Sequence, residues 1–114
     1  ALPIYLEKIN MLDFQFHPEA DREADHEFDY LRLHGGDNVA SRFLDTLEHA
    51  INSCRSHPLL YRTFHKDVRR IIFHKPFGEY YLPFVVLDEK IYILAVAHAK
   101  RKPFYWRERL KDAQ

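Results

Sequence analysis

Cysteine, glycine and long apolar runs are the features that this sequence has least of. Cys54 is its single cysteine, so an internal disulfide framework is excluded. Its three glycines are too few for a glycine-rich phosphate loop. No apolar run approaches the roughly eighteen residues that a membrane-spanning helix needs, and no secretory signal pattern is recognisable. We therefore expect a cytoplasmic protein without a membrane partner.

The eight histidines do not form a metal motif either. None of their spacings is the His-x-x-x-His of a helical metal site, and Cys54 has no Cys-x-x-Cys partner. Cys54 falls on the apolar face of an expected helix, which favours a small core residue over a nucleophile. We expect no bound metal and no cofactor.

Length and composition indicate one domain. A chain of 114 residues with 46% apolar composition can bury one core and is too short for two. We place this domain at residues 11–110. Met11 stands just before the first convincing strand, so our hypothesis is that translation begins there and that residues 1–10 are an extension that is not native.

The net charge of zero hides a strong asymmetry between the two halves of the chain. Residues 1–54 hold four Lys and Arg against eleven Asp and Glu, a net of −7, whereas residues 55–114 hold thirteen against six, a net of +7. A basic half suggests an anionic partner. The alternative is that the charges only coat exposed helices and strands.

The first elements are predicted to be a strand and an acidic helix. Residues 12–17 alternate apolar and polar side chains with the period of a half-buried strand. Pro18 then suits the first turn of a helix. The helix carries one apolar stripe and ends at Gly35-Gly36; the stripe consists of Ala20, Ala24, Phe28 and Leu31.

A second helix is predicted to follow at once, with Asp37 or Asn38 as its cap and His57-Pro58 as its end. Its apolar positions also fit helical spacing; they are Ala40, Phe43, Leu44, Leu47, Ala50, Ile51 and Cys54. Two amphipathic helices joined by a short turn form a hairpin that must pack on another layer.

The second half of the chain is predicted to supply a sheet after a polar loop at residues 59–66. Pro83 cannot donate to a strand ladder, so we expect a bulge or a sheet edge there. The strand expected at residues 91–98 is nearly all apolar, which indicates a position in the middle of the sheet. A short basic helix should begin near Pro103. The expected strands are residues 68–74, 80–87 and 91–98.

This order of elements predicts an α+β fold. An N-terminal strand precedes a helical hairpin, which packs on one face of a mainly antiparallel four-stranded sheet, and a short C-terminal basic helix ends the domain. The other face of the sheet is expected to be free for function.

Three segments, taken in order, resemble the ParE/RelE toxins of type II toxin–antitoxin systems, and the ParE-like members more closely. The resemblance covers nearly all of the chain from Met11 to Arg109. The segments are Phe16-His17-Pro18-Glu19-Ala20, then Asp67-Val68-Arg69-Arg70, and then Val96-Ala97-His98-Ala99-Lys100-Arg101-Lys102-Pro103 with Trp106 and Arg109.

The resemblance implies a toxin that is neutralised by a cognate antitoxin. It also implies that the toxin forms a homodimer or joins the antitoxin in a heterotetramer. ParE-like members inhibit DNA gyrase without a recognised chemical step, and this is the function that we favour. The alternative is a RelE-like endonuclease that cuts mRNA on the ribosome. A second alternative is a module that binds an antitoxin but is not toxic.

Matching to the RelE pattern separates the first two possibilities. It places Arg101 at the position of a catalytic arginine, and it places Tyr80 or Tyr81 at the position of another. A guanidinium stabilises phosphorane charge with two hydrogen bonds, whereas a phenol cannot. The match therefore favours a gyrase inhibitor that is not an enzyme, with Arg101, His98 and Tyr81 as the candidates if there is catalysis.

The residues expected to bind the target or the antitoxin are Arg69, Arg70, Lys100, Arg101, Lys102, Trp106 and Arg109. Adjacent residues of a strand point to opposite faces, so only one of Arg69 and Arg70 can lie on the free face, and the other can pair with a helix acid. His98 suits a general base near neutral pH or a hydrogen-bonded structural role. Trp106 suits an anchor for the tail.

Overall fold

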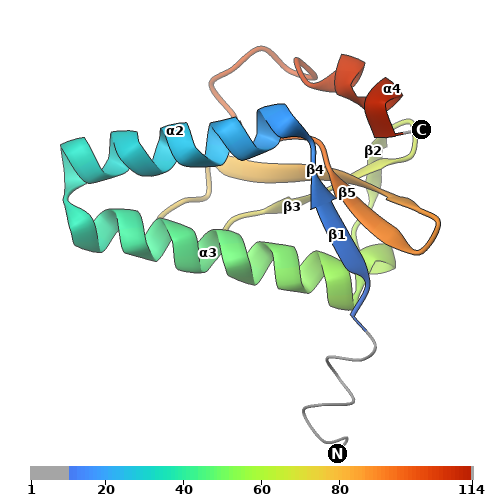
Figure 1. Cartoon of the computed structure of the whole chain (residues 1–114), viewed down its shortest axis with the longest axis horizontal. Coiled ribbons are helices and arrows are strands. Elements are labelled where there is room, and N and C mark those ends of the chain that lie inside the picture. Colours follow the sequence, from blue (N-terminus) through green and yellow to red (C-terminus); the bar gives the residue numbers. More distant parts are fainter. Residues whose placement is uncertain (1–10, 114) are drawn as a thin grey trace, which may run out of the picture.

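Two long helices lie side by side and cover one face of a twisted sheet (Figure 1). The computed structural model describes residues 11–113, so our hypothesis about residues 1–10 lies outside the described residues. The helices are α2 (Pro18–Gly35), α3 (Asp37–Ser56) and a C-terminal turn, α4 (Leu110–Ala113), with 3-10 turns η1 (Pro58–Leu60) and η2 (Arg107–Arg109). The strands are β1 (Asp13–Phe16), β2 (Thr63–His65), β3 (Val68–Ile72), β4 (Tyr80–Leu87), β5 (Lys90–Ile93) and β6 (Ala97–His98).

The ends of the two long helices follow from their capping residues. The His17 ring accepts a hydrogen bond from the Glu19 backbone N–H at 3.0 Å, and Pro18 occupies the first turn as expected. Gly36, at φ 89°, ends α2 and is also the cap of α3. The prediction of Asp37 or Asn38 as cap was wrong, because the single linking residue needs a positive φ, which glycine adopts freely. Within residues 11–113 no helix is long and apolar enough to cross a membrane.

The sheet is mixed, and its strand order is β1-β5-β4-β3-β2, with β6 also pairing with β4. Only β1 and β5 run parallel, so the mainly antiparallel sheet is confirmed. The expected number of four strands was wrong. Strand β2 lies in the segment expected to be a loop, and the strand expected at residues 91–98 is divided into β5 and β6.

Pro83 explains why that strand is divided. Phe73 donates its backbone N–H to Tyr80 O at 3.0 Å, so Phe73 and Tyr80 form a hydrogen-bonded pair of the β3–β4 ladder. Hydrogen-bonded and non-hydrogen-bonded pairs alternate along an antiparallel ladder, which makes Arg70 and Pro83 a non-hydrogen-bonded pair. The backbone position at which Pro83 lacks an N–H therefore faces β5 and β6 rather than β3. On that side two β4 residues stand opposite three residues of the partner segment. The expected irregularity is therefore present, but Pro83 is buried in a central strand and not at an edge.

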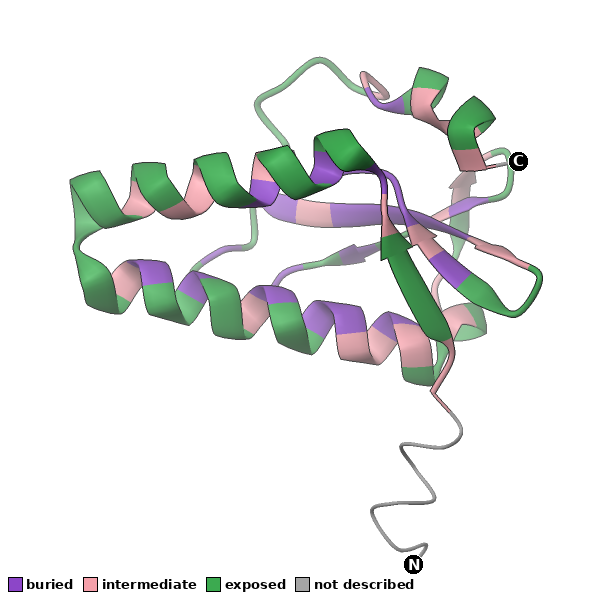
Figure 2. Ribbon diagram, viewed as in Figure 1, coloured by how far each residue is buried: buried purple, intermediate pink, exposed green. Residues whose placement is uncertain are grey.

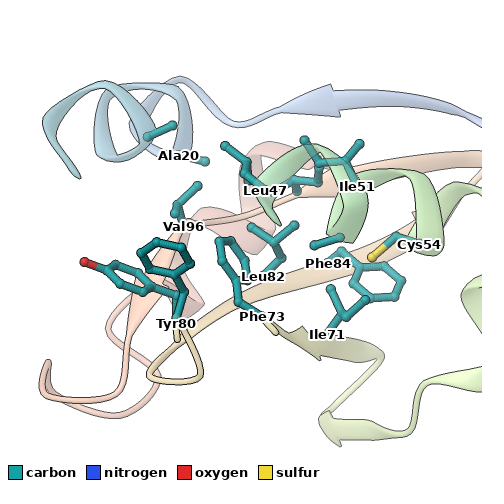
Figure 3. Packing of buried hydrophobic residues seen from close by; sticks show 14 of the residues in the cluster. Ala20, Leu47, Ile51, Cys54, Ile71, Phe73, Tyr80, Leu82, Phe84 and Val96 are labelled. Atoms are coloured by element: carbon teal, nitrogen blue, oxygen red, sulfur yellow. The ribbon is translucent and has the colours of Figure 1, made fainter. Parts of the chain in front are cut away.

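The main core lies between the helical hairpin and the sheet (Figures 2 and 3). Ala20 and Ala24 of α2 bring that helix close to the sheet, whereas α3 contributes larger side chains. Phe43 is fully buried and packs against the rings of Phe73, Phe77 and Tyr80. Cys54 is also fully buried in this core, and burial raises the pKa of its thiol to about 12. This agrees with a core residue rather than a nucleophile.

The opposite face of the sheet is covered over much of its area, so the expectation of a free face was wrong. The chain after β6 folds back across it (Figure 1), and Trp106 is fully buried in a second apolar cluster with Val68, Val85 and Leu94. The helix expected from Pro103 begins only at Leu110, after turns and η2. Phe104 has φ 60°, which is not a right-handed helical conformation.

Candidate functional site

A shallow depression of about 210 Å³ remains at the border between the sheet and the C-terminal segment. Arg70 of β3, Tyr81 of β4 and Arg101 of the turn after β6 meet there. Arg70 stands opposite Pro83 in the ladder and Ile72 opposite Tyr81, so Arg70 and Tyr81 share one face of two neighbouring strands. Three residues expected to be functional are therefore brought together by the fold.

Arg70 is exposed and is held by aromatic rings. Its guanidinium lies 4.7 Å from the ring centroid of Phe64 and 5.7 Å from that of Tyr81. Such cation–π contacts orient the guanidinium and leave its N–H groups available to an anion.

Arg69 lies on the opposite face, as the alternation along a strand predicts. It donates to the backbone oxygen of Tyr61 and does not pair with an acidic residue of a helix. It is only partly exposed, and it connects β3 to the segment that precedes β2.

Glu23 of α2 organises the C-terminal side of the site. Its carboxylate accepts hydrogen bonds from Arg101 Nη1 at 2.9 Å and from the Tyr105 hydroxyl at 2.7 Å. It also accepts two from Arg109, at 2.9 and 3.1 Å, and one from the Val96 backbone N–H at 3.1 Å. One carboxylate thus connects α2, the β5–β6 connection and three residues of the tail.

The two arginines that share Glu23 differ in exposure. The Arg109 side chain is only 15% exposed, and it also donates to Leu94 O at 3.0 Å. The Arg101 side chain is 54% exposed, and its guanidinium lies 3.7 Å from the Tyr105 ring centroid. Burial, together with the hydrogen bond to Glu23, raises the pKa of Tyr105, so its hydroxyl remains a donor. Arg109 therefore holds the tail, whereas Arg101 is held in place but still accessible.

His98 has both ring nitrogens engaged. Nδ1 accepts the Lys100 backbone N–H at 3.1 Å, so the ring proton belongs on Nε2, which lies 3.1 Å from the Glu79 carboxylate. The ring also packs edge-on against Tyr80, whose hydroxyl donates to Glu27 at 2.7 Å. Burial, followed by that hydrogen bond, raises the pKa of Tyr80. Neither His98 nor Tyr80 is placed to remove a proton from a ligand in the depression.

The other expected residues take different places. Lys100 and Lys102 are exposed on the turn beside Arg101. Trp106 is fully buried and donates its indole N–H to the Tyr81 hydroxyl at 3.2 Å. Trp106 therefore anchors the C-terminal segment on the sheet and helps to fix the position of the Tyr81 hydroxyl.

Sequence reasoning did not identify the role of Glu23, nor did it predict that Arg70 and Arg101 line the same depression. Glu23 is one of several acidic residues on α2, and no local pattern distinguishes it from the rest. Arg70 and Arg101 are 31 positions apart, and only the sheet and the returning tail bring them into one depression.

The arrangement is suited to binding an anion. Two guanidiniums with N–H donors available and a phenol line the depression and suit a phosphate or carboxylate group, while the exposed Glu79 carboxylate lines it as well. Residues 11–113 contain no group of three or more histidine, cysteine or carboxylate side chains placed to hold a metal ion.

Comparison with solved structures first defines the class of fold. The chain is similar to a chain described as "Chromosomal ParDE TA system from P. aeruginosa", with a TM-score of 0.66 and 15% identity over 78% of this chain and 97% of that chain. At this identity the match shows the fold, which is that of ParE-like α+β toxins. No curated protein matches.

The family itself is shown by sequence. The family model described as "ParE toxin of type II toxin-antitoxin system, parDE" matches residues 14–103. The chain therefore belongs to the ParE toxin family of type II toxin–antitoxin systems, and the resemblance seen in the three sequence segments is confirmed.

Proposed function

We propose that this chain inhibits growth by acting on DNA gyrase in the cytoplasm and is neutralised by a cognate antitoxin. Membership of the ParE family supports this function. The observation that carries it is the depression itself, where Arg70 and Arg101 are held with free donors while the nearby His98 has both nitrogens engaged. Such a site favours binding over proton-transfer catalysis.

The test is gyrase supercoiling in vitro with the purified chain and with Arg70→Ala and Arg101→Ala. Each variant should raise the concentration for half-maximal inhibition by about tenfold or more, because charge-assisted hydrogen bonds to the target are lost. Arg107→Ala is the matched control, since Arg107 is exposed but lies on η2 outside the depression. Equal effects of all three variants would argue for charge alone and against this site.

A second function, mRNA cleavage on the ribosome, is favoured by one observation. Arg70 supplies the second guanidinium that matching by sequence did not find, because it lies in the same depression as Arg101 and Tyr81. Ribosome-programmed cleavage should therefore be assayed beside supercoiling. Cleaved message with active gyrase supports the nuclease, whereas no growth arrest and neither activity supports a module that only binds antitoxin.

The proposed antitoxin site is the outer edge of β3. Strand β2 pairs only with Val68 and Arg69, so among residues 11–113 no strand residue is registered opposite Ile72 on that side. The ladder with β4 places the Ile72 N–H on this open side, and the Ile72 side chain is 52% exposed. A groove of about 630 Å³ follows this edge and carries Arg62 and Arg70. These features suit an extended acidic segment that adds a strand.

Two substitutions at Ile72 separate backbone from side-chain recognition. Ile72→Pro removes the outward N–H but none of the hydrogen bonds to β4, so it should weaken antitoxin binding by about tenfold. Ile72→Ala retains the N–H and should weaken binding less. Titration calorimetry with the cognate antitoxin measures both affinities, and equal losses for the two variants would contradict strand addition.

A further inference from the structure

His49 and His74 form a pair that lies in the groove proposed for the antitoxin, but the argument for strand addition does not use it. His49 is an exposed residue of α3, and His74 lies two residues after the end of β3. Both are exposed, and their ring centroids are 4.6 Å apart with the planes inclined at 58°. Both side chains line the groove beside the β3 edge.

The backbones that carry the two rings are held firmly. His49 lies within the long helix α3, between the buried residues Leu47 and Ala50. His74 O accepts the Phe77 backbone N–H at 2.9 Å, and the adjacent Phe73 packs on Phe43 of α3. The two histidines are therefore brought together by the core beneath them, so little ordering of the backbone is needed for both to bind one ligand.

The spacing of the rings permits a shared metal ion. An ion about 2.0 to 2.1 Å from one nitrogen of each ring leaves the ring centroids roughly 4.5 Å apart when the two bonds meet near a right angle, and roughly 5.2 Å apart at a tetrahedral angle. The observed 4.6 Å fits the right-angle case, which is typical of copper(II) and nickel(II). Imidazole is a preferred ligand of zinc, copper and nickel and not of magnesium or calcium.

We propose that His49 and His74 bind one divalent transition-metal ion through two imidazole nitrogens. In residues 11–113 no third metal-binding side chain joins a group with them, so two histidines are the protein's whole share. The remaining positions belong to water. Arg62 and Arg70 in the same groove oppose a cation electrostatically, so binding depends on imidazole coordination and excludes magnesium. The ion connects α3 to the β3–β4 connection and stabilises the folded chain by linkage.

The test uses the full chain without antitoxin, so that its outcome does not depend on the proposed function. Zn²⁺ and Cu²⁺ are titrated by calorimetry, with Mg²⁺ as the negative ion, and the thermal midpoint is measured with and without Zn²⁺. His49→Gln and His74→Gln should each lower the affinity by about tenfold or more, because chelation by two ligands held together is lost. The double variant should bind more weakly still, since each single variant keeps one imidazole, but this second loss should be smaller than the first because the chelate is already gone.

His34→Gln is the matched control. His34 is an exposed histidine whose ring packs at 4.4 Å on Tyr30, which is not a metal ligand here, so its replacement should change nothing. The Cu²⁺ complex should show two nitrogen ligands by electron paramagnetic resonance, and one in either single variant. Unchanged binding in His49→Gln or His74→Gln, or an equal loss in His34→Gln, overturns the proposal. Binding that appears only with dimerisation also overturns it, because the ion then bridges two molecules.

Discussion

At the scale of single residues, Glu23 shows how one carboxylate can define a surface. The side chain is only 13% exposed and accepts from two guanidiniums, a phenol and a backbone N–H. Two positive charges share one negative charge, so the cluster retains a net positive charge that emerges at the exposed Arg101. The residue most accessible to a partner is therefore held by one that is hardly accessible.

Replacing Glu23 with glutamine should lower the free energy of unfolding by about 2 to 3 kcal/mol. The substitution preserves shape but leaves Arg109 partly buried without its anionic partner. Urea denaturation measures the loss. Glu19→Gln is the control on the same helix, since Glu19 and its partner Arg22 are both largely exposed and their pair contributes below about 1 kcal/mol. Similar losses for the two variants would show that Glu23 does not hold the tail.

The arginines of the depression show a division of roles at the same scale. Arg101 and Arg109 both belong to the third sequence segment that resembles the toxin family, but only Arg101 retains accessible donors. Arg69 and Arg70 are adjacent in sequence, but only Arg70 lies in the depression. Exposure and partners, rather than residue type, distinguish a binding arginine from a structural one.

At the scale of elements, Gly36 decides the geometry of the helical hairpin. It alone separates α2 from α3, at φ 89°, and its N–H still bonds to Arg32 O. A side chain added there meets no atom within 4 Å, so the cost of substitution is conformational and not steric. The close antiparallel packing of the two helices therefore depends on one left-handed residue.

Gly36→Ala should lower the free energy of unfolding by about 1 to 3 kcal/mol, because φ 89° with ψ 171° is a backbone region that essentially only glycine adopts. Gly78→Ala is the matched control. A side chain at Gly78 meets nothing closer than 4.0 Å, and its φ is not in that region, so its change should stay within about 0.5 kcal/mol. Thermal and urea unfolding measure both, and an equally small change at Gly36 would mean that the hairpin turn can relax.

Elements with their own periodic pattern were predictable, and elements held only by neighbours were not. Residues 80–87 form β4 and residues 37–56 form α3 almost as the apolar spacing indicates. Strand β2 has three residues and exists because it pairs with β3. The division between β5 and β6 depends on Pro83 in a different strand, which no inspection of residues 91–98 reveals.

At the scale of the whole molecule, the opposed charges of the two halves are partly used inside the fold. Glu23 of the acidic half pairs with Arg101 and Arg109 of the basic half. Three of the remaining arginines, Arg62, Arg70 and Arg101, line the depression or the groove along the β3 edge. The charge asymmetry therefore indicates both how the halves associate and where an anionic partner is expected.

The family, the α+β class, the two long helices and the basic ending were determined by the sequence alone. Each depends on local periodicity, capping residues or ordered motifs, which are properties of neighbouring residues. Only the tertiary structure decided that the tail covers the second sheet face, that Glu23 holds Arg101, and that Arg70 and His74 meet partners from distant segments. Those contacts depend on which side chains bury together when the whole chain folds, and that choice is made by packing and charge pairing across long separations in sequence.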